Sequence, residues 1–426
     1  MSNLRALVVG CPFPVTGGGR RCYEVVKRYS KFGIVPYFAL IWPRNLRNYA
    51  VAARILNSLG QYGVKFLPLP SPFRRSQLKF RVKKPWFLNE ANLLLQTSRY
   101  ASQLIQLIKD KGLNFDFVIG QHECLDTVYM THLIAKKLGL YSIVMLQSPP
   151  FYQKSDKILV LKRFSELKFS LLSRYYKLLR IVFRELMGIS IRPQFDKLKF
   201  SALLKRLDLL LSVSESIGYE MGGHWSRQVK TVKPSLAVDD IIKRFKKRPF
   251  HKKNHVVYYC RLVPEKGIYE LPFIWRNFLR YVDRSYRLLV IGGFGSSYVR
   301  RIFQVLVKRL GVEDSIHVLG YMEGRRLFTT VAEAKALLYP SHIDSFSLVV
   351  LESLSLGTPV VSYDIPAIRF NYSNVEGIKM VPEFDLEAMA QKLSELVEKP
   401  PRFKRIETPT WDQVAQAEIE TILSRN

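Results

Sequence analysis

Short apolar runs alternate with amphipathic stretches from the start of the chain. Residues 5–9 form an apolar run that predicts a buried strand. Three glycines at residues 17–19 predict a loop, and apolar positions at helical spacing then continue to Gly33, where a helix would stop. Residues 36–42 predict the next strand. This β-loop-α-β order is typical of the opening of a doubly wound parallel sheet, although the glycine spacing is not that of a dinucleotide fingerprint.

The same alternation continues through the chain and restarts after Pro234. In the first series, further strands are expected at 117–119, 141–146 and 209–213. In the second series, we expect strands at 256–259, 287–291, 316–319 and 336–339, with helices at 298–310 and 325–334. Two successive βαβ arrays joined near residue 235 predict an α/β protein with two Rossmann-like domains that face a cleft.

A segment at residues 151–206 departs from this alternation. Between Phe164 and Leu186, apolar residues recur at helical spacing, and basic residues fall largely on the opposite side. A basic amphipathic helix suits the interface of an anionic membrane. An ordinary helix that packs on its apolar stripe is the alternative, and the pattern leaves both open.

Composition places the chain among folded proteins with an excess of positive charge. Its 426 residues, 48% of them hydrophobic, fit two domains of about 200 residues each. The 66 Lys and Arg against 35 Asp and Glu give a net charge of +31. A field of this size indicates an anionic partner, which could be nucleic acid, a membrane surface or a phosphorylated substrate, unless it reflects a generally basic composition.

Cysteine usage and hydropathy bear on the compartment. The four cysteines lie far apart and show no metal-binding spacing, which indicates a reduced, cytoplasmic protein without structural zinc. The apolar run at the N-terminus is too short for a signal peptide, and no run approaches 18 apolar residues, so we expect no spanning helix.

The segment at residues 339–361, YPSHIDSFSLVVLESLSLGTPVV, carries the clearest chemistry. It predicts a short strand, an acidic loop that begins at Asp344, and an apolar helix that ends before Gly357. The N–H groups and the dipole of a helix N-terminus favour an anion. Asp344 and Glu352 flank this position, and carboxylates accept hydrogen bonds from the hydroxyls of a sugar and a ribose.

A pair of cations follows the first strand of the second array. Arg261 and Lys266 lie in the sequence YYCRLVPEKG. At the carboxyl end of a strand they would point toward a ligand, and a guanidinium with an ammonium can hold a diphosphate from two sides.

These two segments resemble the retaining glycosyltransferases of family 4, the glycosyl transferases group 1. Members carry a related ExxxxxxxE motif and a G-R-L-x-x-x-K-G run; here Asp344 replaces the first Glu, and Cys260 stands where Gly is usual. The resemblance implies a GT-B fold. It assigns acceptor binding to residues 1–235, nucleotide-sugar binding to 236–410, and a helix that crosses back to the first domain to 411–426.

The resemblance also implies roles for individual residues. Arg261 and Lys266 would neutralise the leaving nucleoside diphosphate, Glu352 would bind the ribose, and Asp344 the donor sugar. His122, at the end of a strand, would contact the transferred sugar, whereas Gln147 stands where relatives often have His. The remaining donor-site residues that the resemblance indicates are Gly18, Gly19, Gly293, Tyr321, Ser347 and Leu348.

The sequence therefore predicts a hexosyltransferase that moves a sugar from a nucleotide-diphosphate sugar to a lipid-linked or anionic acceptor at the cytoplasmic membrane face. The resemblance implies retention, and the missing DxD motif is consistent with chemistry that needs no metal or other cofactor. The basic run from Arg74 to Lys84 supports an anionic acceptor. Alternatives are a nucleic-acid-binding protein in which Phe80 and Trp86 stack on bases, and a sugar-nucleotide epimerase.

Overall fold

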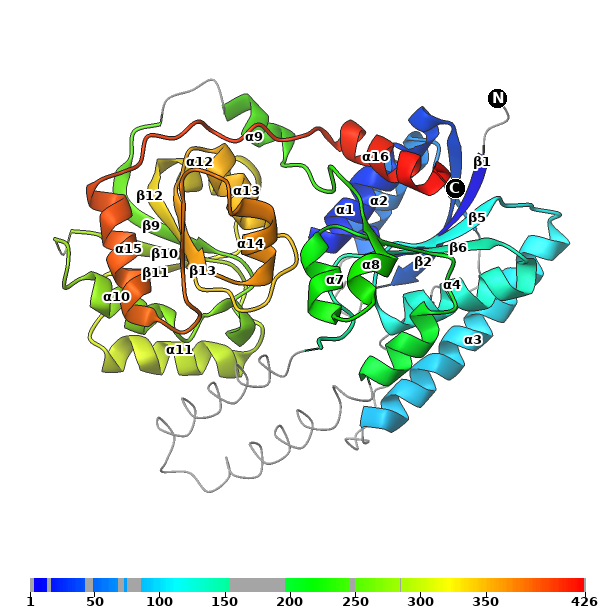
Figure 1. Ribbon diagram of the computed structural model, residues 1–426, viewed down its shortest axis with the longest axis horizontal. Coiled ribbons are helices and arrows are strands. Elements are labelled where there is room, and N and C mark those ends of the chain that lie inside the picture. The colour runs from blue at the N-terminus through cyan, green and yellow to red at the C-terminus, as the bar shows by residue number, and fades with distance from the viewer. Residues whose placement is uncertain are drawn as a thin grey trace. The chain divides into compact units, whose positions relative to one another are not determined.

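The computed structural model describes most of the chain and divides it into two compact units. The described residues are 4–13, 17–42, 49–67, 73–74, 86–153, 196–245, 250–283 and 285–424. Of these, unit 1 contains the residues up to 153 together with 196–236 and 410–424, and unit 2 contains residues 237–409 (Figure 1). The amphipathic helix expected at 164–186 and the basic side chains between residues 74 and 84 lie outside the described part.

Unit 1 is built on a parallel sheet with the strand order β3-β2-β1-β5-β6-β7-β8, and β4 pairs with β2 off this path. The strands are β1 (Leu4–Gly10), β2 (Ile34–Trp42), β3 (Lys65–Phe66), β4 (Phe73–Arg74), β5 (Phe117–Gly120), β6 (Tyr141–Leu146), β7 (Leu209–Ser212) and β8 (Val229–Thr231). The order reverses between β1 and β5, because the chain first adds strands on one side of β1 and then on the other. The apolar runs predicted these central strands well, since side chains such as Val8 and Ile119 are fully buried.

The helices of unit 1 connect and cover these strands. They are α1 (Gly17–Val26), η1 (Tyr29–Phe32), α2 (Tyr49–Gln61), α3 (Trp86–Asp110), α4 (Leu125–Leu138), residues 196–204, α7 (Glu215–Met221), α8 (Trp225–Gln228) and α16 (Trp411–Leu423). The helix expected up to Gly33 is in fact α1 followed by the short 3₁₀ helix η1. Gly33 ends η1 with φ 77°, a left-handed conformation that glycine adopts without steric cost.

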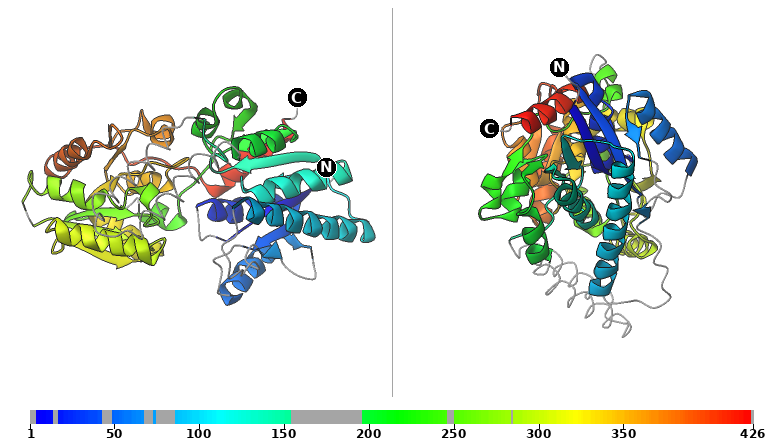
Figure 2. Two further views of the ribbon diagram at one scale, coloured as in Figure 1. Left: turned by 90° about the horizontal axis from the view of Figure 1, so that it is seen from below. Right: turned by 90° about the vertical axis from the view of Figure 1, so that its right-hand side faces the viewer.

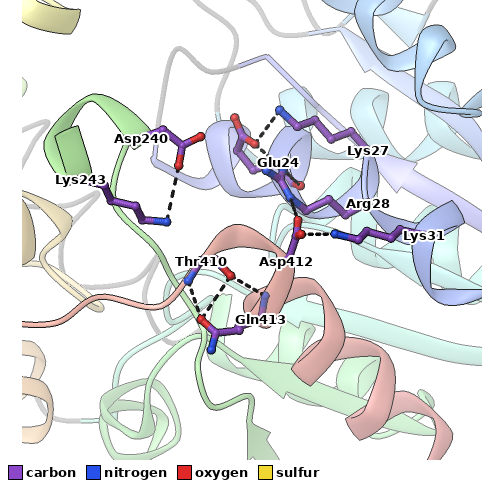
Figure 3. A network of polar contacts seen from close by, with 9 residues as sticks. All are labelled: Glu24, Lys27, Arg28, Lys31, Asp240, Lys243, Thr410, Asp412 and Gln413. Carbon is purple, nitrogen blue, oxygen red and sulfur yellow. Dashed lines mark hydrogen bonds and ion pairs between the residues drawn. The ribbon is translucent and has the colours of Figure 1, made fainter.

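Helix α16 belongs to unit 1 although the chain reaches it from unit 2. Thr410 caps it, since its hydroxyl accepts from the Gln413 N–H while the Gln413 side chain accepts from the Thr410 N–H (Figure 3). Asp412 in its first turn pairs with Arg28 and Lys31 beside α1 and η1. These contacts fix the final helix onto the first helical segment of the same unit.

Unit 2 contains a six-stranded parallel sheet with the order β11-β10-β9-β12-β13-β14. Its strands are β9 (Lys253–Tyr259), β10 (Arg287–Ile291), β11 (Ile316–Gly320), β12 (Ala334–Tyr339), β13 (Val360–Tyr363) and β14 (Ile378–Val381). Here the order reverses between β9 and β12. Both strands are buried except for the exposed first two residues of β9 and the half-buried Lys335 of β12, and Val257 and Leu337 are fully inaccessible to solvent.

The helices of unit 2 alternate with its strands. They are α9 (Asp240–Phe245), η2 (Pro264–Lys266), α10 (Leu271–Phe278), α11 (Ser297–Arg309), α12 (Gly324–Glu333), α13 (Leu348–Ser355), α14 (Pro366–Tyr372) and α15 (Leu386–Glu398). Figures 1 and 2 show helices on both sides of each sheet. The prediction of two Rossmann-like α/β domains is therefore confirmed. None of the helices in the described ranges combines the length and apolar character needed to cross a bilayer.

Candidate functional site

The candidate residues of unit 2 follow the carboxyl ends of neighbouring strands. Arg261 comes after β9, Gly293 after β10 and Asp344 after β12. In open parallel sheets, ligands bind at this edge, at the point where the strand order reverses. The reversal between β9 and β12 lies between Arg261 and Asp344, so the topology brings together residues that are far apart in sequence.

Close packing of three loops shapes this edge. A side chain at Gly292, which has φ 144°, would place its Cβ 1.9 Å from the Cys260 carbonyl oxygen. At Gly267 a Cβ would lie 2.0 Å from the Pro340 carbonyl oxygen. Only glycine permits these two approaches, because backbone atoms cannot move aside as a flexible side chain can. The loops after β9, β10 and β12 therefore form one tightly packed surface.

Lys266 and Asp344 are joined in an ion pair at this surface. The Lys266 Nζ donates to Asp344 Oδ2 at 2.8 Å and to the Ile343 carbonyl at 2.7 Å. The Tyr339 hydroxyl also donates to Asp344. Burial raises the pKa of Asp344, but the Lys266 charge and the hydrogen bonds outweigh it and lower the pKa to about 2. Asp344 is thus a permanent carboxylate, and the two predicted residues lie side by side.

Arg261 differs from Lys266 in its surroundings. Its side chain is exposed and forms no ion pair with any residue that the structure describes. The preceding Cys260, which stands where glycine is usual in the resemblance, donates from its thiol to the Arg261 carbonyl at 3.3 Å. Burial raises the pKa of Cys260 to about 11, so this side chain stays an uncharged thiol at neutral pH. The guanidinium of Arg261 is therefore available for an anionic ligand.

Ser347 begins α13 in an unusual conformation. Its φ of 64° and ψ of 64° are left-handed, a region that residues with a Cβ adopt at a cost of about 1 kcal/mol or more. The fold thus holds a serine in a conformation that glycine adopts more readily. The Tyr372 hydroxyl donates to the Ser347 carbonyl at 3.1 Å, whereas the buried Ser347 Oγ has no hydrogen-bond partner among the described residues.

Ser347 is the N-cap of α13 and follows Asp344 by three residues. The first N–H groups of a helix have no acceptor within the helix, and here they belong to Leu348 and its neighbours. Together with the helix dipole they form a position that favours an anion. Ser347 and Leu348 therefore lie where the sequence placed them, at a helix start beside the Lys266–Asp344 pair.

Glu352 lies in the second turn of α13 and is only 5% exposed. Burial and then the negative charge of Glu352 raise the pKa of Tyr259, the last residue of β9, well above its ordinary value. The Tyr259 hydroxyl donates to the Val349 carbonyl at 2.7 Å. Glu352 is thus held close to the end of β9, at the reversal point of the sheet.

Gly293 and Tyr321 complete the predicted set in unit 2. Gly293 is exposed, and a Cβ there would meet no atom within 4 Å. Tyr321 is 72% exposed, and its hydroxyl donates to Glu323. It follows β11, which is two strands or about 10 Å from β9 along the sheet. Tyr321 therefore belongs to the same edge but to its outer part.

The candidate residues of unit 1 meet at the corresponding edge of the other sheet. Gly18 and Gly19 follow β1, and His122 follows β5, at the reversal point of that sheet. The prediction that residues 17–19 form a loop is wrong, because they form the first turn of α1. The His122 Nε2 lies 3.1 Å from the Cys11 carbonyl oxygen, which fixes the orientation of the ring.

Gln147 links these residues, although the sequence gave it no role. Its amide Nε2 donates to the Gly18 carbonyl at 3.1 Å and to the Gln121 carbonyl at 2.7 Å, and lies 3.4 Å from His122 Nδ1. A Cβ at Gly18 would lie 2.9 Å from Gln147 Oε1. The signals in the sequence were its place after β6 and its position where relatives often have His.

A buried histidine in unit 2 was also missed. His342 lies two residues before Asp344, and both of its ring nitrogens face carboxylates, those of Glu270 and Glu383. A lone histidine in the mixed sequence YPSHIDS carries no local pattern that would distinguish it. Its partners come from distant segments and are visible only in the fold.

The fold and the two strand edges define the class of protein to which the chain is similar. The Anabaena protein Alr3699/HepE, in a crystal structure with UDP, superposes with a TM-score of 0.59 at 12% identity, over 98% of this chain and 95% of that one. Sucrose-phosphate synthase from Thermosynechococcus elongatus gives 0.61 at 14% identity, over 98% and 94%. The two parallel α/β units are therefore the GT-B fold of such glycosyltransferases.

Sequence comparison then identifies the second unit. Residues 239–409 match the family Glycosyl transferases group 1. A D-inositol 3-phosphate glycosyltransferase from Xylanimonas cellulosilytica is 30% identical over 152 residues, which is 33% of this chain and 36% of that protein. The match thus spans about a third of that curated relative. Almost all of unit 2 is therefore similar to a glycosyl transferases group 1 domain.

Proposed function

We propose that the protein is a retaining glycosyltransferase that transfers a sugar from a nucleotide-diphosphate sugar to an acceptor. One observation carries the proposal: Arg261, Lys266 and the start of α13 converge at the reversal point of the sheet in unit 2. This edge lies within the segment that matches the glycosyl transferases group 1. The UDP complex of HepE, which shares the fold, also supports a nucleotide as ligand.

The leaving diphosphate would be stabilised by charge. The exposed guanidinium of Arg261 offers a planar fork to phosphate oxygens, and the Lys266 ammonium adds a compact point charge. Lys266 has three N–H donors, so it can turn one toward a phosphate while keeping part of its contacts to Asp344 and Ile343. With the N–H groups at the start of α13, these cations would stabilise the leaving group without requiring a metal or another cofactor.

The two carboxylates would bind the rest of the donor. Because its pKa is lowered to about 2, Asp344 stays ionised and can only accept hydrogen bonds, as contacts to sugar hydroxyls require. Glu352 would accept from the ribose hydroxyls in the same way. No side chain in this arrangement is an evident nucleophile, so we propose attack on the same face of the sugar. The leaving phosphate then takes the acceptor proton, and the anomeric configuration is retained.

We propose that unit 1 binds an anionic or lipid-linked acceptor. No Asp or Glu occurs from residue 25 to residue 89, whereas 13 Lys and Arg do. At neutral pH this stretch would attract an anion. His122, oriented by the Cys11 carbonyl, would contact the transferred sugar.

The membrane part of this proposal rests on the basic pattern at residues 164–186. We expect the chain to bind vesicles that contain anionic lipid and not neutral ones, and to lose binding when Arg174, Lys177, Arg180 and Arg184 are changed to Gln. Unchanged binding of that variant would remove the membrane surface from the proposal.

Turnover of candidate donors tests the activity itself. The purified chain would be incubated with UDP-, GDP- and ADP-sugars and a lipid-linked acceptor, and the product followed by proton NMR. Transfer with the donor's anomeric configuration supports the proposal, and an inverted product would overturn retention. If a sugar nucleotide were epimerised without an acceptor, or if only nucleic acid bound, the transferase assignment would fail.

A further inference from the structure

His342 lies at the centre of a buried charged cluster beside the candidate donor site. Its side chain is inaccessible to solvent. The Nδ1 lies 2.9 Å from Glu383 Oε1, and the Nε2 lies 3.1 Å from Glu270 Oε1. The aromatic ring of Phe384 stacks on the imidazole at a centroid distance of 4.5 Å. The orientation of the ring is therefore fixed from three directions.

A doubly protonated imidazole between two carboxylates fits these contacts. A carboxylate only accepts hydrogen bonds, and a neutral imidazole has a single N–H, so both contacts can be hydrogen bonds only when both nitrogens carry a proton. The second oxygen of Glu270 accepts from the Tyr363 hydroxyl at 2.6 Å. The side chain of Glu383 is 33% exposed.

The charged groups around His342 agree with this state. Burial lowers the pKa of His342, but the hydrogen bonds and charges of Glu270 and Glu383 outweigh it and raise the pKa above 6.5. Tyr363 faces the ring at 5.0 Å, and its own pKa is raised by burial and by Glu270, Glu383 and Asp385. The neighbouring elements thus present carboxylates and a phenol that stays neutral.

The cluster connects the loops that carry the predicted catalytic residues. Glu270 precedes α10, four residues after Lys266, and His342 comes two residues before Asp344. The backbone N–H of His342 donates to the Glu265 carbonyl at 3.0 Å. The backbone and the side chain of His342 therefore both connect one loop to the other. Any change in the charge of His342 therefore acts on the two segments that position the Lys266–Asp344 pair.

We infer that His342 is a positioning residue: its imidazolium holds the loop of Lys266 against the loop of Asp344 in the arrangement that binds the donor diphosphate. This inference rests on the proposed function of the same site. When the imidazolium loses a proton, the lone pair of one ring nitrogen faces a carboxylate. Both groups are acceptors, so no hydrogen bond forms between them. The two loops then lose a connection, and nucleotide affinity falls as the pH rises through the raised pKa of His342.

Nucleotide binding as a function of pH tests this inference in the full-length chain. We expect the dissociation constant for UDP, measured by calorimetry between pH 6 and 9, to rise about tenfold across an alkaline transition. His342→Gln should bind weakly at every pH and lose this transition. Glu383→Gln removes one of the two carboxylates and should move the transition to lower pH. His255→Gln alters another buried histidine of unit 2, which bonds the Thr330 carbonyl, and should keep the transition.

The charge of His342 is measured independently by NMR titration of its ring, assigned by comparison with His342→Gln. Titration above pH 6.5 is expected, and titration at or below 6.5 would overturn the inference even if nucleotides bind. If the His342 ring titrates above pH 6.5 but the UDP affinity of the wild-type chain does not change with pH, the inference would also be overturned. If neither UDP nor another nucleotide bound at any pH, the proposed function would fail, and the ring titration would still decide whether the imidazolium exists.

Discussion

The ammonium of Lys266 lies 2.8 Å from the carboxylate of Asp344, although 78 positions separate the two residues in the chain. The sequence assigned them different tasks, the diphosphate for the lysine and the donor sugar for the aspartate. The ion pair makes these tasks interdependent, because a phosphate that approaches Lys266 competes with Asp344 for the same donors. Substitutions on either side should therefore affect binding and transfer differently.

Asp344→Asn should separate the two effects. The amide no longer competes for the Lys266 charge, so we expect the affinity for a nucleoside diphosphate to be kept or increased. Transfer should fall at least tenfold, because a carboxylate acceptor for the sugar hydroxyls is lost. Calorimetry with UDP and a turnover assay measure the two effects. Asp344→Glu keeps the charge and is the matched control; full activity of Asp344→Asn would contradict the assigned role.

The lowered pKa of Asp344 predicts a dependence of stability on acid pH. A carboxyl whose pKa is about 2 in the folded chain and 3.8 ordinarily contributes stability that is fully present above pH 3.8. That contribution, at most about 2.4 kcal/mol, is lost as the pH falls from 3.8 toward 2. Denaturant unfolding between pH 3 and 6 should show the wild-type free energy approaching that of Asp344→Asn at the acid end. A constant difference would contradict the depressed pKa.

Ser347→Gly should stabilise the chain. Glycine adopts the left-handed conformation at this position without steric cost, and the substitution also removes a buried hydroxyl that lacks a partner. We expect the free energy of unfolding to increase by about 1 kcal/mol. Ser345→Gly is the control, since Ser347 and Phe384 are the non-glycine residues with positive φ in the described ranges. Equal effects of the two substitutions would argue against strain at Ser347.

Gln147 should matter for transfer more than for nucleotide binding. Gln147→Ala removes the donors to the Gly18 and Gln121 carbonyls, and we expect turnover to fall about tenfold. Gln147→Glu should be worse, because it places an acceptor against these two carbonyl oxygens. The UDP affinity of unit 2 should change little in either variant. If Gln147→Glu were more active than Gln147→Ala, the proposed role of its amide would be wrong.

Transfer should proceed without an added divalent metal. Arg261, Lys266 and the start of α13 supply the positive charge that a metal would otherwise provide. We therefore expect equal rates with EDTA and with Mg²⁺ or Mn²⁺. A loss of activity in EDTA that Mn²⁺ restores would contradict this part of the proposal.

Local patterns predicted the strands, and the positions of several candidate residues at the strand ends, for a common physical reason. A buried parallel strand needs an apolar run, and the residues after it lie at the carboxyl edge of the sheet, which is why Arg261 and Asp344 could be placed at that edge from sequence. The first turn of α1 at residues 17–19 could not be predicted from sequence, because three glycines favour a loop as readily as a helix start. Tertiary contacts hold that turn, including the bond from Gln147 to Gly18 over 129 positions.

The remaining features depend on contacts between distant segments. His342 and Glu270 are 72 positions apart, and nothing in their local sequences indicates that a carboxylate will face each ring nitrogen. The conformation of Ser347 is similarly set by its surroundings, because the Tyr372 hydroxyl binds its carbonyl from another helix. Serine has a low propensity for the left-handed backbone conformation, and the fold imposes this conformation on Ser347.

Calorimetric titration with UDP, GDP and ADP tests the central claim, that the carboxyl edge of β9 and β12 binds a nucleoside diphosphate. The full-length chain would be compared with Arg261→Ala and Lys266→Ala, and with Arg280→Ala as a control at an exposed arginine of unit 2. We predict that at least one nucleotide binds the wild-type and control chains and binds both site variants at least tenfold more weakly. Undiminished binding by both site variants, or no binding by the wild-type chain, would contradict the account.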